Sequence, residues 1–120
     1  MMLIVSASFS QDIITASQAN SIAPGSELVR TSRYSSVPDY IQFRKGNEIS
    51  LQEVIPYLRQ HFNLNTAMDF KLLSSEKDRL GFTHDRYQET CNGIPLQGSM
   101  YIVHSKNGKV ISMNGMIFPS

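Results

Sequence analysis

Three runs of strand-forming residues within 80–113, separated by two Asn-Gly steps, constrain this 120-residue sequence most strongly. The steps are Asn92-Gly93 and Asn107-Gly108. Asn and Gly both tolerate positive φ, which a type I′ turn requires at its two central residues. Because β-rich runs flank each step, each predicts a hairpin, and together they predict a three-stranded antiparallel meander.

The first of these connections carries a complication, because Ile94-Pro95 follows it at once. Pro95 has no N–H and cannot donate to a strand ladder, so it belongs at a strand start, an edge or a bulge. We therefore expect the first connection to be longer than two residues. The second connection, between Lys106 and Lys109, is expected to be the tight two-residue hairpin.

A helix is predicted over residues 50–62, after a short β-type run at 40–44. Ser50-Leu51-Gln52-Glu53 fits a capping box, in which the Glu carboxylate reaches back to the Ser amide. Pro56 falls inside the pattern, and one alternative starts the helix there and shortens it to about eight residues. We favour a longer, kinked helix, because the capping box agrees with one apolar stripe. The stripe consists of Leu51, Val54, Ile55, Leu58 and Phe62.

The order of predicted elements indicates an α+β fold. A strand at 69–74 precedes the meander, which gives one main helix packed on about four antiparallel strands, with the run at 40–44 as a further candidate. Residues 39–118 are expected to form this domain. Residues 11–38 are expected to be a loop or arm, with a short helix at 12–20 and a short strand at 27–31 as local candidates.

The two ends of the chain are apolar. Residues 1–10 resemble the remnant of a secretory signal, with a frayed apolar N-terminus as the alternative. The apolar run at 116–118, just before the last residue, indicates a chain cut from something longer. A signal of this kind predicts a secreted, extracellular or periplasmic protein.

Composition excludes several classes of function. At 41% hydrophobic residues the chain can form one core, and its net charge of +1 is made of interspersed acids and bases. Phosphate binding requires a concentrated basic face, so nucleic acid is not expected as a partner. Nothing approaches the roughly 20 consecutive apolar residues of a membrane span, so no membrane contact is expected after signal removal.

Groups for catalysis or metal binding are few. His61, His84 and His104 are the histidines of the sequence, and Cys91 is its one cysteine. None has the spacing of a metal site, and H-E-x-x-H is absent, so we expect no metal, no cofactor and no enzyme activity. Cys91 with His84 or His104 is the one candidate for nucleophilic catalysis, and nothing next to Cys91 in the sequence would activate it.

Side-chain alternation divides the first strand of the meander into two faces. Two interpretations stay open, because neither face is uniformly apolar. One sheet face docks onto a partner, or it is solvated and held by cross-strand pairs. The first face carries His84, Arg86 and Gln88, and the second carries Asp85, Tyr87 and Glu89.

Four short motifs in this order resemble the fungalysin/thermolysin propeptide domain, which is found in the pro-region of secreted thermolysin-like zinc metalloproteases. They are G-x-T-H-x-R-Y-Q at 81–88, N-G-x-P at 92–95, G-x-x-Y-x-V-H at 98–104 and N-G at 114–115. Their order is more specific than any one of them. The motif positions, which are also the candidate docking residues, are Gly81, His84, Arg86, Tyr87, Gln88, Asn92, Gly93, Pro95, Gly98, Tyr101, His104 and Gly115.

Three positions depart from the family pattern. Cys91 stands where an aromatic residue is more usual, Leu96 where Val is usual, and Glu89 where Gln is common. We interpret these differences as tolerated variation in hairpin packing.

The resemblance implies a cystatin-like fold and a non-catalytic pro-domain that acts as an intramolecular chaperone and helps keep the protease latent. Its partners would be the cognate catalytic domain and the remaining pro-region, joined in cis. A free-standing secreted cystatin-like binding or inhibitor module is the alternative. A third hypothesis is a small enzyme or ligand-binding domain with a pocket lined by His84, His104 and Cys91.

Overall fold

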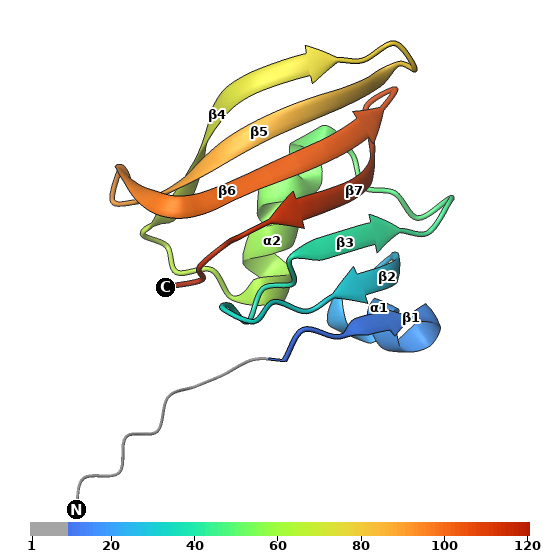
Figure 1. Cartoon of the computed structure of the whole chain (residues 1–120), viewed down its shortest axis with the longest axis horizontal. Coiled ribbons are helices and arrows are strands. Elements are labelled where there is room, and N and C mark those ends of the chain that lie inside the picture. Colours follow the sequence, from blue (N-terminus) through green and yellow to red (C-terminus); the bar gives the residue numbers. More distant parts are fainter. Residues whose placement is uncertain (1–9) are drawn as a thin grey trace, which may run out of the picture.

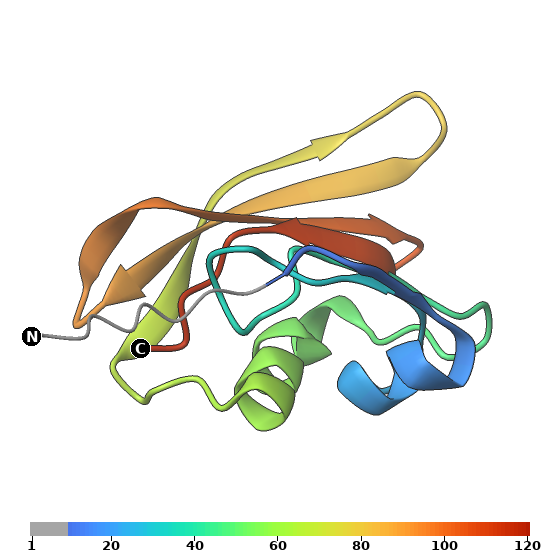
Figure 2. The same cartoon turned by 60° about the horizontal axis from the view of Figure 1, so that its bottom comes forward.

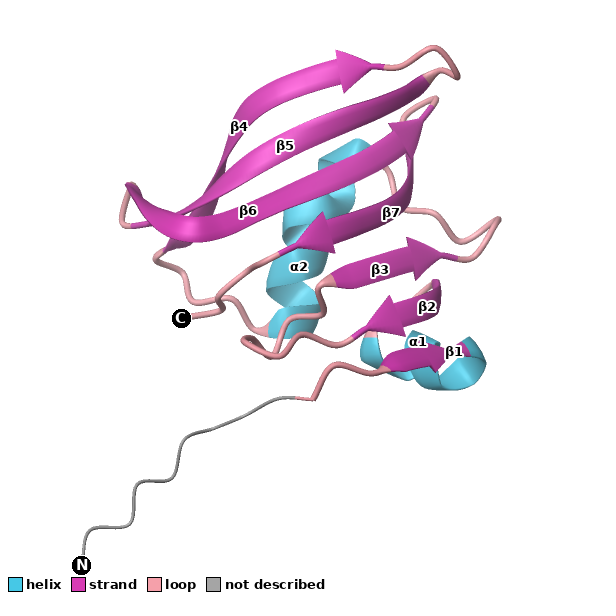
Figure 3. Ribbon diagram, in the orientation of Figure 1, coloured by secondary structure: helices cyan, strands magenta, loops and turns pink. Residues whose placement is uncertain are grey.

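Seven antiparallel strands form an open sheet, and two helices cover one of its faces (Figures 1 and 3). The computed structural model describes residues 10–120. The spatial order of the strands is β1-β2-β3-β7-β6-β5-β4. The elements are β1 (Ile13–Thr15), α1 (Ala16–Ile22), β2 (Ser26–Arg30), β3 (Tyr40–Phe43), α2 (Val54–Phe62), β4 (Met68–Lys77), β5 (Phe82–Cys91), β6 (Ile94–Lys106) and β7 (Lys109–Gly115).

Both Asn-Gly steps form two-residue turns, and the predicted meander is β5-β6-β7. Asn92 and Gly93 have φ of 51° and 81°, and Asn107 and Gly108 have 53° and 78°, as a type I′ turn requires. Cys91 pairs directly with Ile94 across the first turn. The prediction of a longer first connection is therefore wrong.

Pro95 is accommodated within β6 instead. It is the second residue of the strand and pairs with Thr90. The β5–β6 ladder shifts register between Gln88 and Thr90, and the β6–β7 ladder begins only at Tyr101. Pro95 thus lies beside a bulge, in a part of β6 with no β7 partner, where a missing N–H breaks few ladder bonds.

Helix α2 starts between the two positions that the sequence alternatives proposed, after the capping box and before Pro56. The Glu53 carboxylate accepts hydrogen bonds from the Ser50 N–H (3.3 Å) and Oγ (2.8 Å), as the capping box predicts. This cap precedes a 3₁₀ turn at Leu51–Glu53, and the α-helix runs from Val54 to Phe62. Pro56 is the third residue of α2, within the first turn, where backbone N–H groups lack α-helical acceptors. The long kinked helix and the start at Pro56 are both wrong.

The core lies between α2 and the middle of the sheet. Val54 and Leu58 of the predicted stripe are buried in it. Tyr57, which lies off that stripe, is also buried, and its hydroxyl donates to the carbonyl oxygen of Pro24 at 2.8 Å. The same core contains buried residues of four central strands: Val29, Ile41, Phe43, Tyr101, Val103, Val110 and Met113.

The N-terminal third extends the sheet, so the expected loop or arm at 11–38 is corrected. It contains β1, α1 and β2, and β3 joins them to β7 through the pairs Tyr40–Asn114 and Gln42–Ser112. The α+β class is confirmed, but the sheet has seven strands rather than about four. The strand expected at 69–74 is the longer β4. Apart from Ser10, the expected signal remnant at 1–10 lies outside the described residues.

Strands β4, β5 and β6 are the longest, and they extend beyond the helices (Figure 2). The other face of the sheet carries no helix of the described chain. Within residues 10–120, no helix has both the length and the apolar character needed to cross a bilayer.

Candidate functional site

The side of β5–β7 away from the helices carries an aligned set of motif side chains. Tyr87 and Tyr101 pair on the helix side of β5 and β6, and Tyr101 is only 2% exposed. Since successive side chains alternate across a sheet, the neighbours of these tyrosines lie on the open side. We name this surface the motif face; it consists of His84, Arg86, Gln88, Met100, Ile102, His104 and Asn114.

The remaining motif residues shape the ends and bends of these strands. Gly81 has a φ of 88° in the β4–β5 turn, and Gly98 has a φ of 80° in the irregular part of β6. Asn92, Gly93 and Pro95 form the β5–β6 turn region described above. The structure therefore divides the candidate residues into those on the motif face, the two helix-side tyrosines, and residues that set backbone geometry.

One row of polar side chains crosses the motif face from the β4–β5 turn to β7. His84 and His104 are directly opposed on β5 and β6, and their Nδ1 atoms lie 2.6 Å apart. His84 Nε2 contacts Asp78 Oδ2 at 2.9 Å, and His104 Nε2 contacts Asn114 Oδ1 at 2.6 Å. Asp78 is not among the residues singled out from the sequence, and Asn114 appears there only within the N-G motif at 114–115, not as a partner of the histidines.

Proton positions in this row follow from the acceptors at its ends. A carboxylate and an amide oxygen both accept, so His84 Nε2 and His104 Nε2 both donate. One of the two Nδ1 atoms then donates to the other. With the Asn114 amide reversed, His104 Nε2 accepts instead of donating, and the row keeps all its contacts. Hydrogen bonding by His84 holds the pKa of Asp78 below its usual value.

Gln88 and Arg86 differ in the number of hydrogen bonds that their side chains form within the domain. Gln88 Nε2 donates to the carbonyl oxygens of Leu96 (2.8 Å) and Ser99 (2.9 Å), so it closes the irregular part of β6. Arg86 is exposed, and its one side-chain hydrogen bond among the described residues is to Met100 Sδ at 3.6 Å. No ion pair within residues 10–120 includes Arg86. Arg86 is thus the motif-face charge that is free to meet a partner.

The structure does not assemble the third hypothesis, a pocket lined by both histidines and Cys91. Cys91 is half-buried and lies seven residues beyond His84 on β5, roughly 23 Å at 3.3 Å per residue. Among residues 10–120, no three His, Cys, Asp or Glu side chains are grouped to hold a metal ion. His61 lies on α2, in edge contact with the Tyr57 ring at 4.6 Å between centroids.

Two surface hollows lie elsewhere. One, of about 330 Å³, is lined by Glu27, Gln42, Phe43, Lys45, Glu48 and Ile111. The other, of about 260 Å³, is lined by Ser10, Asp12, Thr31, Ser32, Ser35 and Ser36.

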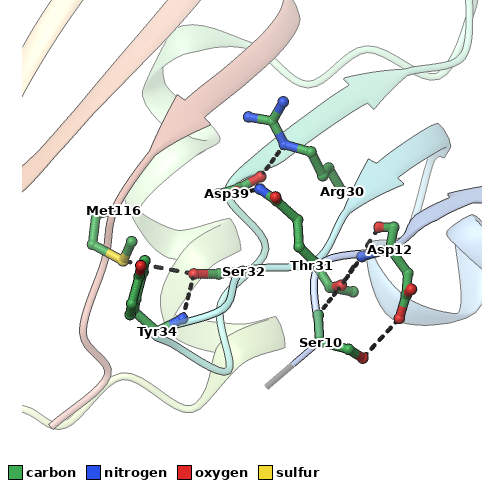
Figure 4. Close-up of polar contacts among 9 residues, drawn as sticks. Ser10, Asp12, Arg30, Thr31, Ser32, Tyr34, Asp39 and Met116 are labelled. Carbon is green, nitrogen blue, oxygen red and sulfur yellow. Dashed lines mark hydrogen bonds and ion pairs between the residues drawn. The ribbon is translucent and has the colours of Figure 1, made fainter. Parts of the chain in front are cut away.

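Polar contacts at the second hollow join segments far apart in the chain (Figure 4). Thr31 Oγ1 accepts from the Asp12 N–H at 2.8 Å and donates to the Ser10 carbonyl at 2.6 Å. Arg30 pairs with Asp39 at 2.6 Å. Thr31 holds the segment before β1 against the end of β2, and the Arg30–Asp39 pair links β2 to the residue before β3, so we assign the cluster a structural role. Local sequence patterns could not reveal it, because its partners are 9 to 21 residues apart.

Residues 69–117 match the family model described as the Fungalysin/Thermolysin Propeptide Motif. The match covers β4 except its first residue, all of β5–β7 and the two residues after β7. It therefore includes the entire motif face. The class that the fold and this surface define is an α+β domain carrying a fungalysin/thermolysin propeptide motif, which confirms the resemblance predicted from the sequence.

The chain is similar to several bacterial proteases. It is 34% identical to bacillolysin of Bacillus amyloliquefaciens over 71 residues, 56% of this chain and 14% of the relative. It is 27% identical to thermostable neutral protease NprT of Geobacillus stearothermophilus over 115 residues, 89% of this chain and 21% of the relative. Thermolysin of Alicyclobacillus acidocaldarius is 27% identical over 81 residues, 63% of this chain and 15% of the relative. The chain thus spans about a fifth or less of these relatives.

Proposed function

We propose that this domain is the non-catalytic pro-domain of a secreted thermolysin-like metalloprotease. It assists folding of the catalytic domain and helps keep the protease latent. The observation that carries the proposal is the coincidence of the propeptide motif with an open sheet face whose arginine has no ionic partner in the described chain. The cystatin-like arrangement expected from the sequence is retained as part of the proposal.

The physical basis of such assistance is preferential binding. A surface that binds the native-like catalytic domain but not its unfolded chain stabilises the folded form by mass action. The motif face suits this role because it is preorganised: β5 and β6 form a paired ladder, and the histidine row is held at both ends. A rigid surface loses little conformational entropy on binding.

Docking by the motif face predicts an acidic or polar partner surface. Arg86 can form a bidentate pair with a carboxylate, and Met100 and Ile102 supply half-buried apolar area beside it. Latency would need a further pro-segment that reaches the active site. We assign that step to the remaining pro-region in cis and place this domain as its anchor.

A segment exchange in NprT tests the proposal. The matched segment of NprT is replaced by residues 1–120, and protease secreted by the host is measured by cleavage of a chromogenic peptide. A deletion of the segment serves as the baseline, and intact NprT as the reference. Recovery of activity well above the deletion supports the pro-domain role. Equal activity from the exchange and the deletion contradicts it.

A second measurement distinguishes the pro-domain from a free-standing inhibitor module. The 120-residue chain is added in trans to mature, folded NprT. Inhibition there without rescue in the segment exchange would favour a module that acts on finished protease. Rescue in cis with weak inhibition in trans favours the pro-domain.

A further inference from the structure

The chain after β7 forms a strap, residues 116–119, that is fastened to three other parts of the domain. Ser35 Oγ donates to the Ile117 carbonyl, and the Asn65 N–H donates to the Pro119 carbonyl at 2.8 Å. The Met116 N–H donates to the Met100 carbonyl of β6 at 2.9 Å. Ile117 is 1% exposed and belongs to the hydrophobic core. The strap thus closes one end of the domain beside the loops before β3 and β4.

A buried carboxyl group, that of Glu89, also binds the strap. Glu89 of β5 is 1% exposed, and its Oε1 accepts the Phe118 N–H at 2.8 Å. The same Oε1 lies 2.5 Å from Ser99 Oγ, which also lies 2.9 Å from the Met116 carbonyl oxygen. Glu89 therefore contacts the strap both directly and through Ser99.

Counting hydrogens at this cluster favours a neutral Glu89. A serine hydroxyl has one proton, so Ser99 can donate to Glu89 or to Met116, but not to both. If Glu89 is protonated on Oε1, it donates to Ser99 and Ser99 donates to Met116, so both contacts are satisfied. If Glu89 is ionised, one contact is lost. Its Oε2 is buried with no hydrogen-bond partner in the described chain, which makes a charge there costly.

No neighbouring charge relieves this cost. Arg59 is bound to the Met68 carbonyl at 2.6 Å and to Asp69 at 3.5 Å. No ion pair of the described chain includes Glu89, and the strap itself has no titratable side chain. The titratable or charged groups on the elements packed nearby are Tyr87 on β5, Tyr101 on β6, Asp69 and Lys71 on β4, and Arg59 and His61 on α2.

We propose that Glu89 is a protonation-controlled latch: its neutral carboxyl holds residues 116–118 on the sheet, and its ionisation releases them. Release frees the Phe118 N–H, breaks the Ser99–Met116 link and withdraws Ile117 from the core. The inference concerns the isolated domain and stands whether or not the pro-domain proposal is correct.

The direction of the pH effect follows from linkage. Burial raises the pKa of the Glu89 carboxyl above its ordinary value, and the hydrogen bonds from Ser99 and Phe118, which lower it, offset this only in part. A released Glu89 therefore loses its proton at lower pH than a latched one does. The latched state binds more protons between the two pKa values, so it is favoured at low pH and weakens as pH rises. The opening equilibrium rises by up to about tenfold per pH unit in that window.

Amide hydrogen exchange of the 120-residue chain between pH 4.5 and 7.5 tests the latch. Exchange rates of Met116 and Phe118 are corrected for the intrinsic effect of pH and compared among the wild type, Glu89→Gln and Glu76→Gln. Gln is neutral at every pH, and its Oε1 can accept the Phe118 N–H and the Ser99 hydroxyl as Glu89 Oε1 does. Glu76 on β4 is exposed and provides the same chemical change away from the strap.

If Glu89 acts as a latch, protection of the Met116 and Phe118 amides from exchange falls as pH rises in the wild type and in Glu76→Gln. It stays constant in Glu89→Gln. The same pH profile in all three proteins overturns the latch, as does protection of Met116 and Phe118 in Glu89→Gln that falls with pH as it does in the wild type. A ¹³C titration of the Glu89 carboxyl in the wild type needs no variant. Titration at the ordinary carboxyl pKa, with no matching change in the strap, overturns it too.

Discussion

His84 and His104 face each other across β5 and β6 with their Nδ1 atoms 2.6 Å apart, so only one of these two nitrogens can carry a proton. The two rings are therefore coupled: what one donates, the other must accept. Their outer nitrogens are held by Asp78 and Asn114, which connects the β4–β5 turn with β7.

Coupling between the two histidines is expected to appear in a double-mutant cycle. His84→Ala and His104→Ala each remove one partner, and the double variant removes both. Because the contact is a hydrogen bond between half-buried rings, we expect a coupling free energy of about 0.5–1.5 kcal/mol in urea unfolding. Strictly additive effects would show that the two rings do not interact.

The Asp78 carboxyl is expected to titrate below the ordinary aspartate pKa, chiefly because His84 hydrogen-bonds to it. A lowered folded pKa contributes stability above the ordinary value, and this is lost as pH falls through the lowered one. In His84→Gln the Asp78 pKa should move up toward its ordinary value. The ¹³C shift of the Asp78 carboxyl measures this. An unchanged pKa in the variant would place its cause in the turn backbone instead.

Gly115 is expected to tolerate no side chain. Its φ is 135°, and a Cβ there would lie 2.1 Å from the Met100 carbonyl oxygen. Gly115→Ala should therefore destabilise by about 3 kcal/mol or more, or prevent folding. Gly108→Ala is the control, since its φ of 78° has open space around it and should cost about 1–2 kcal/mol. Thermal unfolding compares them. Equal losses would contradict the close approach of β7 to β6.

The hydroxyl of Tyr57 is expected to stabilise the contact between α2 and the turn after α1. It donates to the Pro24 carbonyl at 2.8 Å, so Tyr57→Phe leaves that oxygen with one partner fewer. We expect a loss of about 0.5–1.5 kcal/mol in the free energy of unfolding. Tyr34→Phe, at a side chain 72% exposed, should change nothing measurable. Equal stability of both variants would remove any role for this bond.

The parts of the fold that were predictable are those with local signals. The two Asn-Gly turns and the capping box lie within a few residues of the elements they define, so β5–β7 and the start of the helical segment could be derived. The exact start of α2 could not, because Pro56 is compatible with several arrangements of the first turn.

Residues 11–38 carry only weak local signals, because distant residues stabilise the structure of this segment. β3 pairs with β7 across about seventy residues, as in Tyr40–Asn114, and Ser35 binds Ile117. The histidine row could be predicted only as a shared face, because Asp78 and Asn114 are brought to it by the β4–β5 turn and by β7. The burial of Glu89 could not be predicted from the sequence, because it depends on the strap, which binds it from 29 residues further along the chain.

Docking of the motif face onto a thermolysin-like catalytic domain is the central proposal for this domain. The most direct measurement is methyl NMR of the labelled chain with an inactive variant of mature NprT. We predict shifts at Met100 and Ile102 on the motif face, none at Ile55 on α2, and at least tenfold weaker binding for Arg86→Glu than for Arg44→Glu. Binding that leaves Met100 and Ile102 unchanged, or no binding at all, would contradict the proposal.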